Sequence, residues 1–445
     1  MSAGIRPDNT VVIVLSFEGP DIYSMAGGLG VRVTELSRAL ANDGFETHLF
    51  FIGDPTRAGH EVAENERWHL HRWCQWLSAQ HTAGVYDGES EKIDDWSRSL
   101  PSHLIDTIIR PAAQAGKCCV ILAEEWHTAS SVINLHHLLR WSGLRERCIM
   151  YWNANNTFGF WHIEWEALRS ACTLTTVSRY MKHKMWSLGL NPLVIPNGIP
   201  ARLLHPPSPT RVSTLRSACG EGPLLVKVGR YDPDKRWIMA VDALHVLKSS
   251  PFGAQRRVRM LVRGGVEAHR VDVMNRAAMH GLTWAEITLA EPTFERIVSA
   301  IADCAFADII ELRFFVPEDV LRVIYAAADA VFANSGHEPF GLVGLEVMAS
   351  GGIAFTGCTG EDYAQSFRNA VVVDSEDARE MAVYVIDLAS HPEEKKRIRR
   401  NAHDTARHFT WDDVLKELYR KLEFSAQVGG VVFRDNARKP RQLAI

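Results

Sequence analysis

A strand–loop–helix pattern at residues 330–352 constrains the fold more than any other stretch of this sequence. Residues 330–333 form an apolar run, which predicts a buried parallel strand. A loop with glycine, proline and a carboxylate follows, and then an apolar helix that ends in a glycine pair. Ligands of open α/β sheets bind at the carboxyl ends of strands, and a helix amino terminus favours an anion. The stretch therefore predicts a ligand site, with Glu338 in the loop and Glu346 about one turn into the helix.

The rest of the chain repeats this alternation of short apolar runs with helical patterns. Further strands are predicted at residues 11–15, 48–52, 118–123, 148–152, 173–177, 224–228, 257–262, 308–314, 353–356 and 370–373. A proline-rich segment at 206–209 has the composition of an interdomain linker. The chain is therefore predicted to form two doubly wound α/β domains with a cleft between them.

The composition fits two globular domains and argues against several other classes of protein. The chain has 445 residues, of which 46% are hydrophobic, and a net charge of -4. These values argue against extended disorder and against nucleic acid as a partner. The first residues lack the apolar core of a signal peptide, and the eight cysteines follow no metal-ligand spacing. A cytoplasmic protein with reduced cysteines, no metal and no organic cofactor is expected.

Polar side chains follow three consecutive predicted strands of the first half. Glu124 and His127 come after the strand at 118–123, Asn153 ends the next strand, and Ser178 follows the third. Because parallel strands bring their carboxyl ends to one edge of the sheet, these residues are expected near a ligand crevice. A purely structural role explains His127 equally well.

Two glycine-containing turns are candidates for binding phosphate. Gly27 and Gly28 precede a helical pattern and would let the backbone approach a phosphate, although a tight turn explains them equally. After the strand at 224–228, one glycine and three cations, including Arg230 and Lys235, stand at a helix start. This set suits a diphosphate, and the alternative is a solvated loop with ordinary surface charges.

A tryptophan-rich segment at residues 60–105 interrupts the alternation. Four tryptophans and their basic neighbours share this segment: Trp68, Trp73, Trp76, Trp96, His69, His71, Arg72 and His81. The run at 66–79 is predicted to be an amphipathic helix. The sequence leaves three roles open for it, which are packing on the domain, lining an acceptor cleft and touching a membrane surface.

Four stretches, taken in order, resemble the retaining GT-B glycosyltransferases of family four, a group related to sucrose synthases and bacterial glycogen synthases. They are residues 27–30, residues 176–180 with 194–199, residues 228–235, and the opening stretch with its two glutamates eight positions apart. The resemblance implies two Rossmann-like domains that face a central cleft. An acceptor domain at 1–205 and a donor domain at 206–410 are expected, with a helix at about 411–424 crossing back and a basic tail at 425–445.

The resemblance also implies roles for four charged residues. Arg230 and Lys235 match the Arg and Lys that hold the donor diphosphate in this family. Fixed cations of this kind stabilise the charge that grows on a departing diphosphate. Glu338 matches the glutamate that contacts the sugar hydroxyls, and Glu346 matches the one that binds the ribose.

Backbone contacts to the donor are implied as well. The loop backbone at Phe340, Gly341 and Leu342 would contact the sugar, and the glycine pair Gly27 and Gly28 would contact the phosphate. Such enzymes need no metal, because side-chain cations and helix amino termini take its place.

The chain departs from the glycogen synthases at two positions. Met25 stands where they carry a lysine, and Glu124 replaces a histidine that lies beside the reacting sugar. Glycogen synthesis is therefore not expected. The prediction is metal-independent, retaining transfer of a hexose from a nucleotide-diphosphate sugar to a sugar, glycan or small-molecule acceptor. The alternative is a non-catalytic sensor or scaffold that binds nucleotide sugars on the same fold.

Overall fold

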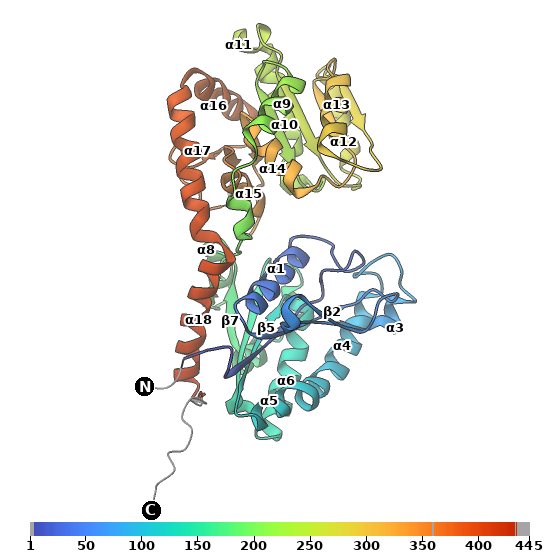
Figure 1. Ribbon diagram of the computed structural model, residues 1–445, viewed down its shortest axis with the longest axis vertical. Helices are drawn as coiled ribbons and strands as arrows, with labels where there is room; N and C mark the ends of the chain where they lie inside the picture. Colours follow the sequence, from blue (N-terminus) through green and yellow to red (C-terminus); the bar gives the residue numbers. More distant parts are fainter. Residues whose placement is uncertain (1–3, 358–359, 432, 434–445) are drawn as a thin grey trace, which may run out of the picture. The chain divides into compact units, whose positions relative to one another are not determined.

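The computed structural model describes residues 4–357, 360–431 and 433, and it divides the chain into two compact units. The first unit runs from the amino terminus to Gly198 and resumes at Trp411, and the second unit comprises Ile199–Thr410. Each unit is a parallel α/β sheet flanked by helices, as predicted (Figure 1). The boundary lies at Gly198 rather than at residue 205, and residues 206–209 belong to the second unit, where Ser208 caps a helix.

The first unit is built on an eight-stranded sheet. Its strands are β1 Thr10–Leu15, β2 Glu46–Ile52, β3 His60–Ala63, β4 Trp68–Trp73, β5 Cys118–Glu124, β6 Cys148–Ala154, β7 Thr173–Thr176 and β8 Leu193–Val194. They are ordered β3-β4-β2-β1-β5-β6-β7-β8, and the antiparallel pairing of β3 with β4 is the exception to parallel pairing. The carboxyl ends of β1, β5, β6 and β7 therefore meet at one edge of the sheet.

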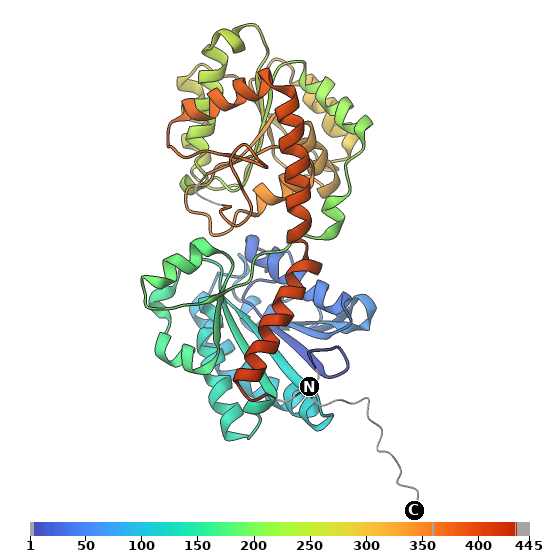
Figure 2. The same cartoon turned by 90° about the vertical axis from the view of Figure 1, so that its left-hand side faces the viewer.

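Helices flank this sheet, and the last of them comes from the end of the chain. They are α1 Gly28–Asn42, α2 Glu64–Arg67, α3 Gln75–Ser78, α4 Glu89–Leu104, α5 Arg110–Gln114, α6 Ala129–Trp141, α7 Trp165–Ala171, α8 Arg179–Trp186 and α18 Trp411–Val428. Leu415, Leu418 and Leu422 of α18 pack in one core with Val33 and Leu36 of α1. In Figure 2, α18 (dark red) runs along the first unit's sheet.

The second unit repeats the plan with seven parallel strands in the order β11-β12-β10-β9-β13-β14-β15. The strands are β9 Leu224–Val228, β10 Arg259–Arg263, β11 Trp284–Ile287, β12 Ile309–Leu312, β13 Ala330–Ala333, β14 Ala354–Thr356 and β15 Val371–Val372. The helices are α9 Pro209–Cys219, α10 Trp237–Ser249, α11 Pro251–Ala254, α12 Arg270–Met279, α13 Phe294–Asp303, α14 Glu318–Ala327, α15 Leu342–Ala349, α16 Ala378–Ser390 and α17 Pro392–Ala406. Strands β9 and β13 are neighbours, so the loops that follow them meet.

The prediction of one amphipathic helix at 66–79 is wrong, because residues 68–73 form strand β4 and only the short helix α3 follows it. Burial alternates along β4 with a period of two residues: Trp68 and Leu70 are buried, and the intervening histidines are half-buried. That alternation belongs to a strand with two different faces. Trp68 and Trp96 are packing residues, whereas the side chain of Trp76 is 60% exposed.

The prediction of a solvated tail from residue 425 is also wrong for its first part. Residues 425–428 complete α18, and Val431 and Phe433 are buried in the core of the first unit. Residues 434–445 of the predicted tail lie outside the described residues. None of the helices described here combines the length and the apolar character that a bilayer crossing requires.

Candidate functional site

The loop between β13 and α15 presents Glu338 beside Lys235. Gly341 precedes α15 at φ 82°, a left-handed conformation that favours glycine, and it turns the chain into the helix. Lys235 ends a 3-10 turn after β9, and its Nζ lies 2.9 Å from Glu338 Oε2. The amide of Gly336 donates to the carbonyl of Asp234 at 2.8 Å, so the two loops are tied together. The structure thus brings together two predicted site residues that are 103 positions apart.

Two more cations flank Lys235. The side chain of Arg230 is exposed, and no hydrogen bond from its guanidinium is found within the described chain. Arg236 adopts φ 51° at the start of α10, and its Nη2 lies 3.2 Å from Glu376. Its Nη1 is buried and has no hydrogen-bond partner among the described residues. Arg236 packs against Gly336, where a Cβ would come within 2.9 Å of its Nε. Donor groups of three cations therefore surround the end of β9.

Glu346 lies in the second turn of α15 and is partly buried. Burial, with Glu318 and Glu338 nearby, raises the pKa of Glu346 to about 7. The neighbouring Phe340 is buried against Tyr363, with ring centroids 5.6 Å apart, so its side chain belongs to the core. The Phe340 side chain is therefore not available to a ligand, and in the same loop the Gly341 carbonyl already accepts from the Tyr363 hydroxyl at 2.5 Å.

Lys227 is a residue of this site that the sequence analysis missed. It lies in β9, is 2% exposed, and donates from Nζ to Asn334 Oδ1 at 2.6 Å and to the carbonyl of Phe332 at 3.2 Å. Burial and the charge of Lys235 lower the pKa of Lys227 to about 7. A lysine in the middle of an apolar strand was the available signal, because buried lysines are rare unless paired.

In the first unit, the amino terminus of α1 already holds an anion, which is the chain's own Glu18 carboxylate. Glu18 Oε2 accepts from the amides of Ala26 (3.2 Å), Gly27 (2.9 Å) and Gly30 (3.0 Å). Tyr86 donates to the other oxygen at 2.5 Å. A Cβ added at Gly27 or Gly28 would meet none of the described atoms within 4 Å. Packing therefore does not require glycine at positions 27 and 28, and space beside them is open.

Glu124 and Asn153 belong to a buried polar network at the carboxyl ends of β5 and β6. Arg32 of α1 donates from Nε to both Glu124 oxygens at 3.2 Å and also donates from Nη1 to Asn197 Oδ1. The side-chain amides of Asn153 (2.8 Å) and Asn155 (2.7 Å) complete the shell of Glu124. Glu124 is 1% exposed, so its carboxylate is engaged with protein groups rather than open to solvent.

His127 lies apart from this network. Its ring is stacked between Phe17 (4.4 Å) and Trp126 (4.1 Å), and its Nε2 lies 2.8 Å from Glu89. Burial lowers the pKa of His127. The structure thus supports the packing role for His127.

Glu125, next to Glu124, is a second buried carboxyl group at the end of β5. It adopts φ 68° and accepts from the Asn155 amide, and burial raises its pKa to about 8.

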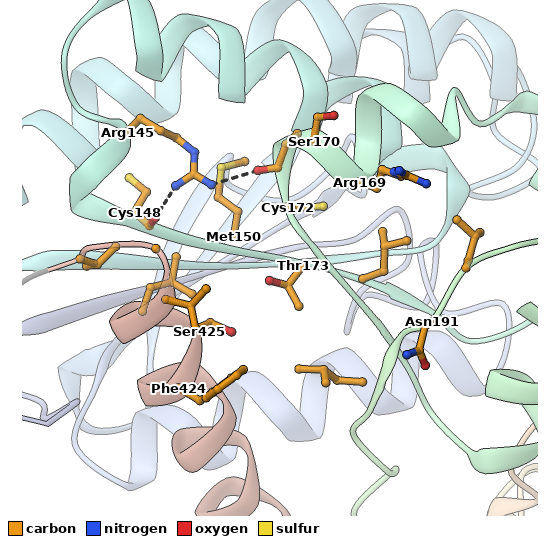
Figure 3. Close-up of a pocket in the computed structure, with 18 of the residues that line it drawn as sticks. Arg145, Cys148, Met150, Arg169, Ser170, Cys172, Thr173, Asn191, Phe424 and Ser425 are labelled. Atoms are coloured by element: carbon orange, nitrogen blue, oxygen red, sulfur yellow. Dashed lines mark hydrogen bonds between the residues drawn. The ribbon is translucent and has the colours of Figure 1, made fainter. Parts of the chain in front are cut away.

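A pocket of about 540 Å³ opens elsewhere on the first unit (Figure 3). It lies at the amino ends of β6 and β7, where Arg145 donates to the carbonyls of Cys148 (2.7 Å) and Ala171 (3.0 Å). The polar network of Glu124 and Asn153 lies at the opposite end of β6, where β6 pairs with β5. We therefore place no part of the candidate site in this pocket.

Family comparisons agree with the two-unit architecture. Residues 26–203 match the family model "Glycosyltransferase Family 4", and residues 217–405 match the model "Glycosyl transferases group 1". A D-inositol 3-phosphate glycosyltransferase of Xylanimonas cellulosilytica is 24% identical over 413 residues, which cover 87% of this chain and 89% of that protein. A mannosylfructose-phosphate synthase of Agrobacterium fabrum is 25% identical over 52% of this chain, and the chain spans about half of its length, 47%.

Solved structures share the fold at low sequence identity. A sucrose-phosphate synthase from Thermosynechococcus elongatus superposes with a TM-score of 0.63 at 18% identity, covering 94% of this chain and all of that one. The trehalose-6-phosphate synthase OtsA superposes with a TM-score of 0.64 at 14% identity, covering 93% and 99%. Because the two family models together take in most of the sequence and the fold is shared, this chain belongs to the family-four-like glycosyltransferases of the GT-B fold.

Proposed function

We propose that this protein is a retaining, metal-independent hexosyltransferase that uses a nucleotide-diphosphate sugar. The observation that carries the proposal is the Lys235–Glu338 pair at 2.9 Å, flanked by the unpartnered Nη1 of Arg236 and by exposed Arg230. Arg230, Lys235 and Arg236 offer N–H donors to a diphosphate leaving group, and Glu338 offers acceptors to the hydroxyls of the sugar.

In the proposed reaction, the bond from the anomeric carbon to the diphosphate oxygen breaks, and the electron pair leaves with the diphosphate. Lys235 and its neighbouring arginines stabilise the charge that develops there. The acceptor hydroxyl attacks from the face that the diphosphate leaves, which retains configuration, and a phosphate oxygen takes its proton. This route requires no protein base.

Related structures suggest which donor to test first. One neighbour, Anabaena HepE, was solved with UDP, and a trehalose-6-phosphate protein of E. coli was solved with UDP-2-fluoro glucose. Several names among the relatives contain a small phosphorylated polyol or sugar. We propose a uridine diphosphate sugar as the donor and a small polyhydroxyl acceptor, including phosphorylated ones.

A thermal-shift screen with UDP, ADP and GDP tests donor binding, since a ligand that binds the folded state raises its melting temperature. The matching sugar nucleotide is then supplied with an acceptor panel, and the anomeric configuration of the product is read by NMR. Asp232 and Asp234 stand in an Asp-x-Asp arrangement, but Asp232 accepts the amide of Asp234 at 2.9 Å. In the proposed site, Arg230 and Lys235 take the place of a metal, so activity is expected to survive EDTA. If none of the nucleoside diphosphates binds, the donor proposal is contradicted. A product with inverted anomeric configuration contradicts retention.

The non-catalytic alternative predicts a different result. A sensor or scaffold binds the donor without cleaving it, whereas the transferase hydrolyses it slowly when no acceptor is present. Donor hydrolysis that disappears in Glu338→Gln therefore excludes the sensor.

Replacing Glu346 with glutamine is expected to make the protein more stable than wild type at high pH and to weaken donor binding. The folded-state pKa of Glu346 is raised from 4.5 to about 7, so its protonated form stabilises the fold fully below pH 4.5. That contribution is lost as pH rises through 7. The shift corresponds to at most about 3 kcal/mol, and partial exposure reduces this to about 1–2 kcal/mol. Between pH 5 and 8 the wild-type protein should lose that much more unfolding free energy than Glu346→Gln.

Glu346→Gln should bind the donor more weakly than wild type, because a carboxylate accepts two ribose hydroxyls better than an amide does. Urea unfolding at pH 5 and pH 8 measures the first effect, and nucleoside diphosphate titration at pH 8 measures the second. Glu393→Gln, an exposed glutamate of α17, is the control and should change neither. Parallel pH profiles for wild type and Glu346→Gln would refute the assignment.

A further inference from the structure

Four histidines gather on one face of the sheet edge formed by β2, β4 and β3. His69 and His71 are two residues apart on β4, so their side chains share a face. Parallel pairing places His48 of β2 opposite His69, and antiparallel pairing places His60 of β3 opposite His71. The other face of β4 carries Leu70 into the core. Strand register alone therefore assembles four imidazoles from three strands.

The ring nitrogens of these histidines meet in two pairs. His48 Nδ1 lies 3.0 Å from His71 Nε2, and His60 Nε2 lies 3.3 Å from His69 Nδ1. The pairs are stacked on each other, since the His48–His69 and His60–His71 ring centroids are each 4.5 Å apart. Two imidazoles on one tetrahedral zinc, each bound at about 2.0–2.1 Å, have nitrogens roughly 3.3 Å apart. The spacing within each pair already suits two ligands of one ion.

A carboxylate lies close to one of the four rings. His48 Nε2 is buried without a hydrogen-bond partner among the described residues, and Glu46 Oε1 lies 3.5 Å from it. Lys117 pairs with the same carboxylate at 3.1 Å. A carboxylate behind one ring nitrogen orients the ring and leaves the other nitrogen for a metal, a common arrangement around zinc.

We propose that His48, His60, His69 and His71 bind one divalent transition-metal ion, with zinc as the best match. Nitrogen donors without a thiolate favour zinc, copper or nickel over the oxygen-preferring magnesium and calcium. No three of these rings yet place nitrogens within 4.8 Å of one another, so forming one shell needs rotation of imidazole rings. Exposed His60 can turn by giving up its 3.3 Å contact with His69 and its stacking on His71. The ion would clamp the β3–β4 hairpin to β2. The proposal is independent of the transferase proposal and concerns the other compact unit.

A second group serves as an internal comparison. Asp387, His391 and Glu394 have ligand atoms within 4.8 Å of one another, but His391 is exposed and Glu394 pairs with Arg397. An ion held there would use a single imidazole, whereas the four-histidine face supplies imidazoles alone. Variants at the two places tell the sites apart.

The test uses the untagged full-length protein after dialysis against a chelator. Zn²⁺ is titrated by calorimetry, and Co²⁺ is added separately, because its visible absorption reports four-coordinate geometry. One equivalent of zinc should bind with a Kd below about 10 µM and raise the melting temperature. His69→Gln should weaken binding more than about 100-fold, beyond the usual cost of losing an outer partner. His280→Gln removes a stacked imidazole that pairs with Asp242 in the second unit, and it should bind zinc like wild type.

Absence of stoichiometric binding in the wild type would overturn the proposal. So would binding that persists in His69→Gln or that disappears in His391→Ala. If His69→Gln does not fold, exposed His60→Gln decides the matter: a loss of about 10-fold or more supports the site, and unchanged affinity overturns it. In that event the four rings are a hydrogen-bonded packing cluster.

Discussion

Replacing Lys235 with alanine is expected to lower kcat/KM about 100-fold while the protein remains folded. Lys235 is the cation whose position the structure fixes most directly, through the 2.9 Å pair with Glu338 and the bond that ties their loops. In the proposed reaction its charge faces a leaving group that becomes more negative in the transition state. Loss of one such fixed group costs about 3 kcal/mol. The side chain is only partly buried, so folding should tolerate its removal.

Kinetics with a saturating acceptor measure this effect, and the separate changes in kcat and in KM for the donor show at which stage the Lys235 charge acts. A fall mainly in kcat indicates stabilisation of the departing diphosphate, whereas a rise in KM alone indicates ground-state binding. Lys396→Ala, an exposed lysine of α17 paired with Glu393, is the matched control and should behave like wild type. Wild-type kinetics in Lys235→Ala would remove Lys235 from the catalytic machinery.

The fold was predictable from the sequence because buried parallel strands leave short apolar runs between helical patterns. The predicted strand at 330–333 coincides with β13. The edge of the first sheet was not predictable in the same way. In so short a run, the histidines and tryptophans of β4 are compatible with either a helix or a strand. The strand forms because its backbone pairs with β2 and β3.

The candidate site was predictable where residues lie at strand ends and not where tertiary contacts decide. Lys235 and Glu338 follow neighbouring strands, so topology brings their loops together. The role of Glu18 was hidden, because the anion at the start of α1 comes from a loop nine residues before Gly27. Arg32 was hidden too, since its partner Glu124 is 92 positions away. Sequence patterns carry no signal for such pairings.

Arg32→Met is expected to destabilise the first unit by about 3–4 kcal/mol, the usual cost of leaving a buried charge unpaired. Both side chains of the Arg32–Glu124 pair are at most 3% exposed, so solvent cannot replace the lost partner. Glu124 would keep its two asparagine donors, whereas Asn197 would lose its guanidinium donor.

Hydrogen exchange in β5 and β6 measures this cost for the first unit by itself, and urea unfolding gives the total. Arg110→Met breaks an exposed pair with Asp106 at 3.4 Å and should cost less than about 0.5 kcal/mol. The double variant Arg32→Met/Glu124→Leu removes both charges, so it should be more stable than Arg32→Met alone. If instead the double variant is less stable, packing and the asparagine bonds, rather than the unpaired charge, govern this network. A cost below about 1 kcal/mol for Arg32→Met would mean that water reaches Glu124, and the carboxylate would then be open to a ligand at the carboxyl end of β5.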